Sequence, residues 1–138
     1  MIQHKQLILN GFIEQSFTKQ YQAKRFLKNL VEIIDMKRII EPVAKYVKAP
    51  GNRGMTAAIL IETSHIAFHI WDEQYPAKIR FDLYTCGDLD VAIVLDYLDR
   101  NLKFYDYPEW FLLDRQGSSV FIVEQSSPGV EIVQAKNA

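Results

Sequence analysis

The sequence predicts a two-layer α+β sandwich, in which two helices lie on one face of an antiparallel sheet. Segments that alternate apolar and polar residues outnumber the helical segments, and short turn-like connections join most of them. The two helical segments are well separated, and the strands are grouped around them. With 138 residues, of which 49% are hydrophobic and 24% charged, the chain is expected to form a single domain over residues 1–138.

The first third of the chain predicts a strand, a helix and an edge strand. Lys5 to Phe12 holds an apolar run and ends at a turn signal, which indicates a strand. From Lys19 to Met36, apolar residues recur every three or four positions, so this segment is an amphipathic helix, with Ser16 or Thr18 as its expected N-cap. Ile39 to Val47 contains a proline and is expected to be an edge strand or an irregular strand.

The middle third predicts three consecutive strands. Residues 49–54 contain a proline and two glycines and form the clearest loop of the chain. Met55 to Glu62 is an apolar run of strand length, and Ser64 to Glu73 alternates cleanly. Lys78 to Thr85 alternates in the same way, so these last two segments are expected to form an antiparallel hairpin.

The last third predicts a second helix, a terminal hairpin and a tail. Either of two aspartates can cap the helix, whose apolar stripe has helical spacing. Two short strand-like segments follow, separated by a polar turn. The expected features are a cap at Asp88 or Asp90, a helix to about Leu102, strands at Trp110–Asp114 and Ser119–Glu124, and a polar tail beyond Ser126.

One face of the predicted sheet is left without a cover. It carries His69, Trp71 and Tyr84 among charged residues, so it is neither fully polar nor fully apolar. Such a face suits contact with a partner subunit. We therefore expect a homodimer in which the partner covers this face.

Composition and charge exclude several classes of partner. Residues 1–50 carry a charge of +5 and residues 51–138 a charge of −6, but the basic residues lie on a helical pattern without an aromatic platform or a Gly-rich phosphate loop. No apolar run approaches the roughly 20 residues that span a bilayer. We expect no nucleic-acid partner and no membrane partner. The lone cysteine, Cys86, and the absence of an apolar signal core predict a cytoplasmic protein.

Motifs for metal, nucleotide and hydrolase sites are missing. Cys86 has no Cys-x-x-Cys partner, and His65 and His69 lie on a strand pattern rather than on a helix, so no metal site is expected. What remains is a set of nucleophilic and titratable residues on two or three strands, which a hairpin is expected to bring together. The set is Thr56, Ser64, His65, His69, Glu73 and Cys86.

Two segments give this set a distinctive order. They read Thr63-Ser64-His65-Ile66-Ala67-Phe68-His69-Ile70-Trp71-Asp72-Glu73 and Asp82-Leu83-Tyr84-Thr85-Cys86-Gly87-Asp88. The order resembles the prokaryotic S-adenosylmethionine decarboxylase proenzymes, whose pattern is Glu-Ser-His-x-x-x-His-Thr-Trp-Pro-Glu followed by Asp-x-Phe-Thr-Cys-Gly-Asp. With Gly54-Met55-Thr56 matching a Gly-x-Ser/Thr, the resemblance covers about residues 5–103. Residues 104–138 are a C-terminal extension without an assigned role.

The resemblance implies a self-processing, pyruvoyl-dependent decarboxylase, which is made as a zymogen. Its substrate is S-adenosylmethionine, and its product supplies aminopropyl groups for spermidine synthesis. The match places the cleavage between Thr63 and Ser64, where the serine hydroxyl attacks the preceding carbonyl and the resulting ester eliminates. The new N-terminus becomes the pyruvoyl cofactor, an electron sink for decarboxylation, so no external cofactor is expected.

The remaining residues of the motif acquire roles by position. Thr56 and His69 look like processing helpers, with His69 handling the proton whose loss opens the ester. Cys86 looks like the proton donor to the decarboxylated carbon, because a thiol with a pKa of about 8.5 can act as an acid near neutral pH. Glu73 resembles a carboxylate that contacts a ribose hydroxyl or a cationic group of the substrate.

Three departures from the family pattern leave alternatives open. Thr63 stands where the family has glutamate, and Glu62, one position earlier, is expected to point to the other face of a regular strand. The threonine at position 63 favours the alternative that the protein is a family relative which does not cleave itself and binds a ligand or another subunit. Asp72 replaces proline, and the segment from His69 to Cys86 is two residues longer than in the family. A remodelled pocket would suit a pyruvoyl decarboxylase of arginine or ornithine.

Overall fold

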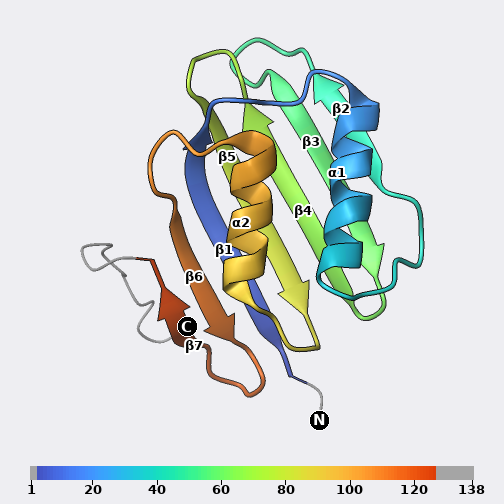
Figure 1. Cartoon of the computed structure of the whole chain (residues 1–138), viewed down its shortest axis with the longest axis vertical. Helices are drawn as coiled ribbons and strands as arrows, with labels where there is room; N and C mark the ends of the chain where they lie inside the picture. Colours follow the sequence, from blue (N-terminus) through green and yellow to red (C-terminus); the bar gives the residue numbers. More distant parts are fainter. Residues whose placement is uncertain (1–2, 127–138) are drawn as a thin grey trace.

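A computed structural model describes residues 3–126 of the chain. Seven strands form one sheet, and both helices lie on the same face of it (Figure 1). The elements are β1 (Lys5–Ile13), α1 (Gln20–Ile33), β2 (Val43–Val47), β3 (Gly54–Ile61), β4 (Ser64–Trp71), β5 (Ala77–Thr85), α2 (Val91–Leu102), β6 (Glu109–Asp114) and β7 (Phe121–Gln125). The predicted α+β sandwich is confirmed.

Every pair of neighbouring strands is antiparallel, in the order β2-β3-β4-β5-β1-β6-β7. Consecutive hairpins join β3 to β4 and β4 to β5, and the terminal hairpin joins β6 to β7. β2 lies at one edge and begins directly after Pro42, which agrees with the predicted edge strand because proline cannot donate to a ladder. β1 lies between β5 and β6 and ties the two parts of the sheet together.

Alternation along the strands decides which side chains face the helices. On β4, for example, Ile66 and Phe68 are buried beneath the helices, whereas His65, His69 and Trp71 lie on the opposite face. The apolar side chains of the inner face and of both helices form one core. Its largest fully buried members include Leu7, Leu9, Leu27, Leu30, Met55, Ile59, Phe68, Ile79 and Phe81.

The ends of α1 are held by backbone and side-chain hydrogen bonds. The predicted N-cap at Ser16 or Thr18 is wrong, because the cap position is Lys19 and the Gln22 side chain accepts a hydrogen bond from its backbone N–H at 3.1 Å. At the C-terminal end, Asp35 has a φ of +57°, and the N–H groups of Asp35 and Met36 donate to carbonyls of the last turn. This Schellman motif ends the helix and directs Met36 toward the sheet.

α2 begins as predicted at Asp90, whose side chain accepts a hydrogen bond from the N–H of Ala92 at 3.0 Å. The two helices are joined through Tyr97 of α2, whose hydroxyl donates to the carbonyl of Phe26 at 2.7 Å. The predicted polar tail beyond Ser126 lies outside the described residues. No helix within residues 3–126 is long and apolar enough to cross a membrane.

Candidate functional site

Ser64 lies where the β3–β4 turn enters β4, and its side chain faces the helix layer. The residue is only 6% exposed. Its hydroxyl oxygen accepts a hydrogen bond from the backbone N–H of Cys86 at 3.2 Å, and the hydroxyl is 3.9 Å from the Cys86 sulfur, to which it donates. The structure therefore brings together two of the predicted catalytic residues, a serine and a thiol from neighbouring strands.

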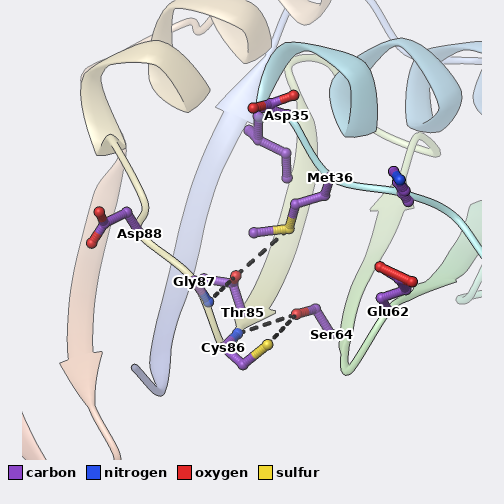
Figure 2. Close-up of a pocket in the computed structure, with 10 residues that line it drawn as sticks. Asp35, Met36, Glu62, Ser64, Thr85, Cys86, Gly87 and Asp88 are labelled. Atoms are coloured by element: carbon purple, nitrogen blue, oxygen red, sulfur yellow. Dashed lines mark hydrogen bonds between the residues drawn. The ribbon is translucent and has the colours of Figure 1, made fainter. Parts of the chain in front are cut away.

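A cavity of about 480 Å³ opens beside Ser64 (Figure 2). Three segments enclose it: the loop after α1, the β3–β4 turn and the loop between β5 and α2. The lining carries three carboxylates and one lysine, so its charge is negative. It consists of Ile34, Asp35, Met36, Lys37, Glu62, Ser64, Thr85, Cys86, Gly87 and Asp88.

The turn before Ser64 has an unusual backbone. Thr63 has a φ of +57°, a left-handed conformation that is costly for a β-branched residue. Its hydroxyl donates to the carbonyl of Glu62 at 2.6 Å and also contacts the Cys86 sulfur. The expectation that Glu62 faces the other side from Thr63 assumed a regular strand, but both are turn residues to which strand alternation does not apply, and Glu62 lines the same cavity as Ser64.

The loop that carries Cys86 is fixed by residues that the sequence did not single out. The buried hydroxyl of Thr85 accepts from the N–H of Gly87 at 3.0 Å and donates to the sulfur of Met36 at 3.6 Å (Figure 2). The carbonyl of Cys86 accepts from the N–H of Gln3 at 2.9 Å. The hydroxyl of Thr85, two residues before Gly87, was a detectable turn signal, whereas the contact with Met36 depends on how α1 ends.

Thr56 and His69 form a second group on the opposite face of the sheet. They are directly paired across β3 and β4, and Oγ1 of Thr56 is hydrogen-bonded to Nδ1 of His69 at 3.0 Å. The bond engages one of the two ring nitrogens and fixes the orientation of the imidazole. The His69 ring also contacts Trp71, with 6.1 Å between the ring centroids.

Glu73 belongs to the same end of the sheet as His69. It follows β4, and its Oε1 accepts a hydrogen bond from the backbone N–H of Arg53 at 3.0 Å. A hollow of about 570 Å³ lies beside it. The hollow is lined by Gly51, Trp71, Glu73, Gln74, Lys78 and Arg80.

The expectation that a hairpin would bring the whole set together is wrong for a single chain. Ser64 and His69 are an odd number of residues apart on one strand, so they face opposite sides of the sheet and lie about 17 Å apart along it. Ser64, Thr63 and Cys86 form one group, and Thr56, His69 and Glu73 form the other. His65 lies on the outer face near the first group, where its ring centroid is 5.5 Å from that of Tyr84.

The described part of the chain contains no group of three or more His, Cys, Asp or Glu side chains arranged to hold a metal ion. Ser64 offers a hydroxyl that follows a residue with a left-handed backbone and lies beside a thiol. The other group offers an imidazole held by a threonine.

The sequence is similar to a known protein family. A sequence model described as S-adenosylmethionine decarboxylase matches residues 7–124, a range that includes β6 and most of β7. The chain belongs to this family. Both the Ser64 group and the His69 group lie within the matched residues.

Individual relatives match a shorter segment. The chain is 33% identical to the S-adenosylmethionine decarboxylase proenzyme of Sulfurihydrogenibium sp. (strain YO3AOP1), over 50% of this chain and 58% of the relative. It is 33% identical to the protein of that name from Clostridium botulinum (strain Hall), over 56% of this chain and 63% of the relative. For the Bacillus velezensis proenzyme the identity is 37%, over 43% of this chain and 44% of the relative. The chain thus spans about three fifths of the first two relatives.

Proposed function

We propose that this protein is a self-cleaving decarboxylase of S-adenosylmethionine, with a pyruvoyl group generated from Ser64. Two features of Ser64 carry the proposal: its hydroxyl accepts a hydrogen bond from the N–H of Cys86, and it directly follows Thr63, whose backbone is left-handed. The negative lining of the adjacent cavity suits the sulfonium and ammonium charges of this substrate. The product would serve as the aminopropyl donor for spermidine synthesis.

Cleavage begins with the chain's own atoms. The Ser64 oxygen attacks the carbonyl carbon of Thr63, the peptide C–N bond breaks, and an ester joins the two residues while the Ser64 amine is freed. Removal of the Cα proton of residue 64 then expels the Thr63 carboxylate. Water converts the remaining dehydroalanine into pyruvoyl and ammonia. The left-handed φ of Thr63 favours the first step, because breaking the peptide bond releases backbone strain.

His69 is the residue we propose for the proton removal, and this requires a second chain. In one chain, His69 lies about 17 Å from Ser64 along β4 and on the other face. In a homodimer joined through the outer faces of the sheets, a two-fold axis can bring the His69 end of one chain beside the Ser64 end of its partner. Thr56 would orient the imidazole, and Glu73 would contact the substrate from the same end.

The residues around Ser64 fit a pyruvoyl group. Cleavage removes the Ser64 oxygen with the Thr63 carboxylate and so frees the backbone N–H of Cys86 as a hydrogen-bond donor, and the cavity beside it is large enough for a substrate. When formed, the group supplies an electron sink for loss of carbon dioxide. Cys86, which lines the cavity, would then deliver a proton from its thiol. A thiol in this role must stay reduced, and we therefore propose that the protein acts in the cytoplasm.

The first experiment is the intact mass of the freshly purified, reduced and denatured protein. Cleavage before Ser64 gives pieces of 63 and 75 residues, the larger one blocked at its N-terminus. A chain that keeps its full mass after prolonged incubation would contradict the proposal and favour a relative that only binds. Release of carbon dioxide from S-adenosylmethionine, but not from arginine or ornithine, then identifies the substrate.

A mixing experiment tests the two-chain site. Ser64→Ala lacks the nucleophile and His69→Ala lacks the proton acceptor, so neither protein should cleave by itself. In a mixed dimer, the His69 of the Ser64→Ala chain should restore cleavage of the His69→Ala chain. If mixed dimers form and no cleavage appears, the two residues act within one chain and the proposed arrangement is wrong.

A further inference from the structure

The loop before β3 is fastened to the end of β4 by an unusually dense set of contacts. The Arg53 guanidinium donates to Oδ1 of Asp72 at 2.9 Å and to its carbonyl oxygen at 2.8 Å. The backbone N–H of Asp72 donates to the carbonyl of Arg53 at 3.1 Å. Tyr46 adds a third side chain, because its hydroxyl donates to Oδ2 of Asp72 at 2.7 Å.

Asp72 is the centre of this cluster and is well shielded. Its side chain is 10% exposed, whereas that of Arg53 is 45% exposed. The hydrogen bond with Asp72 raises the pKa of the Arg53 guanidinium, and burial together with Asp72 raises the pKa of the Tyr46 hydroxyl. Arg53 and Tyr46 therefore keep the protons that they donate to Asp72 through the physiological pH range.

The same loop also holds the two residues on either side of Asp72. Nε1 of Trp71 donates to Oδ1 of Asn52 at 2.8 Å, and the N–H of Arg53 donates to Glu73 at 3.0 Å. Two adjacent loop residues thus contact three consecutive residues of the β4 end. Trp71 and Glu73 both line the hollow beside this end.

We propose that Arg53, acting through Asp72, is a positioning residue that holds Glu73 and Trp71 in the orientation needed to bind the substrate. The inference rests on the proposed function, in which Glu73 contacts S-adenosylmethionine. The new element is that Asp72, which stands where the family pattern has proline, holds this end of β4 in place through its ion pair with Arg53. Asp72 makes no hydrogen bond to Thr56, His69, Ser64 or Cys86, so the ion pair affects substrate binding and not self-cleavage.

The main variant is Asp72→Asn, which keeps the size of the side chain and removes its charge. Asp96→Asn is the matched control, because Asp96 pairs with Arg100 at 2.9 Å in an exposed ion pair on α2. We expect Asp72→Asn to cleave at the wild-type rate, to raise KM for S-adenosylmethionine about tenfold, and to change kcat less than twofold. Asp96→Asn should change none of the three.

A double-mutant cycle separates positioning from general support of the fold. In a Glu73→Gln background, Asp72→Asn should add less than twofold to KM, because the residue through which it acts has already lost its charge. Equal effects in both backgrounds would show that Asp72 merely stabilises the loop, and the inference would be overturned. Unchanged KM in the single variant would overturn it as well.

Binding to the uncleaved Ser64→Ala protein gives a readout that does not need an active enzyme. Calorimetric titration with S-adenosylmethionine should show a dissociation constant about tenfold higher when Asp72→Asn is added. Absence of any effect on binding contradicts the inference. Absence of cleavage and of carbon dioxide release in the wild-type protein contradicts the proposed function instead, so the two failures are distinguishable.

Discussion

His69 follows Ser64 by five residues on β4, and the two side chains lie on opposite faces of the sheet. Strand geometry alone sets this relationship, because an odd spacing always reverses the face. The residues that we propose to form and use a pyruvoyl group are therefore divided between two surfaces of one chain. Each surface can be altered without disturbing the other, and the variants below make use of that separation.

The Thr56 hydroxyl is expected to set the rate of self-cleavage by orienting His69. Thr56→Val removes the 3.0 Å hydrogen bond but keeps the shape of the side chain. Loss of one such bond, worth about 1 to 1.5 kcal/mol, should slow cleavage about tenfold. The time course of the two fragments by denaturing electrophoresis measures this, and Thr56→Ser should restore most of the rate. Wild-type cleavage in Thr56→Val would exclude an orienting role.

Cys86→Ala should separate cleavage from decarboxylation. The substitution keeps the backbone N–H that holds the Ser64 oxygen, so the fragments should still form. Loss of the thiol removes a general acid, and release of carbon dioxide should fall by roughly 100-fold or more. The two measurements are the intact mass and the carbon dioxide release of the same preparation. A Cys86→Ala chain that stays uncleaved would show that the thiol is needed for self-cleavage and not only for decarboxylation.

Gly54 is required where β3 begins beside β4. Its φ is +147°, and an added Cβ would lie 1.8 Å from the carbonyl oxygen of Ile70. Gly54→Ala should therefore lower the free energy of unfolding by about 3 kcal/mol or more. Gly51→Ala is the control, because a Cβ there meets nothing within 4 Å and the φ of +81° alone should cost about 1 kcal/mol. Equal midpoints of urea unfolding for the Gly54→Ala and Gly51→Ala proteins would contradict this prediction.

The buried hydroxyl of Tyr97 should make the folded protein less stable at high pH. Burial raises the pKa of its hydroxyl to about 12, whereas the unfolded chain releases this proton near pH 10. The contribution is fully present below pH 10 and is lost as the pH rises toward 12, because only the unfolded state gains the charge freely. Urea unfolding at pH 7 to 11 should show a smaller decline in Tyr97→Phe.

Tyr97→Phe should also cost about 1 kcal/mol at neutral pH, because the hydrogen bond to the carbonyl of Phe26 joins the two helices. A decline with pH as steep as that of the wild-type protein would assign the effect to other tyrosines.

The periodicity of apolar residues was sufficient to predict the helices and strands but not the residues at which they end. The alternation from Ser64 to Glu73 and the helical spacing from Lys19 to Met36 each depend on one buried face, which leaves a direct mark in the sequence. The N-cap of α1 was missed because Gln22, three residues inside the helix, supplies the hydrogen bond rather than Ser16 or Thr18. Several polar residues near the start of a helix can each supply the capping hydrogen bond, and the sequence pattern does not show which of them does.

The local sequence determined the strands, the hairpins and the residues that make up the motif, because these depend on neighbours within a few positions. Only the tertiary structure decided which of those residues meet. It brought Cys86 to Ser64 from a neighbouring strand, enclosed Glu62 in the same cavity as the loop after α1, and joined Arg53 to Asp72 across 19 positions of the chain. Contacts of this kind arise when distant segments pack, and the spacing of residues along one segment carries no information about them.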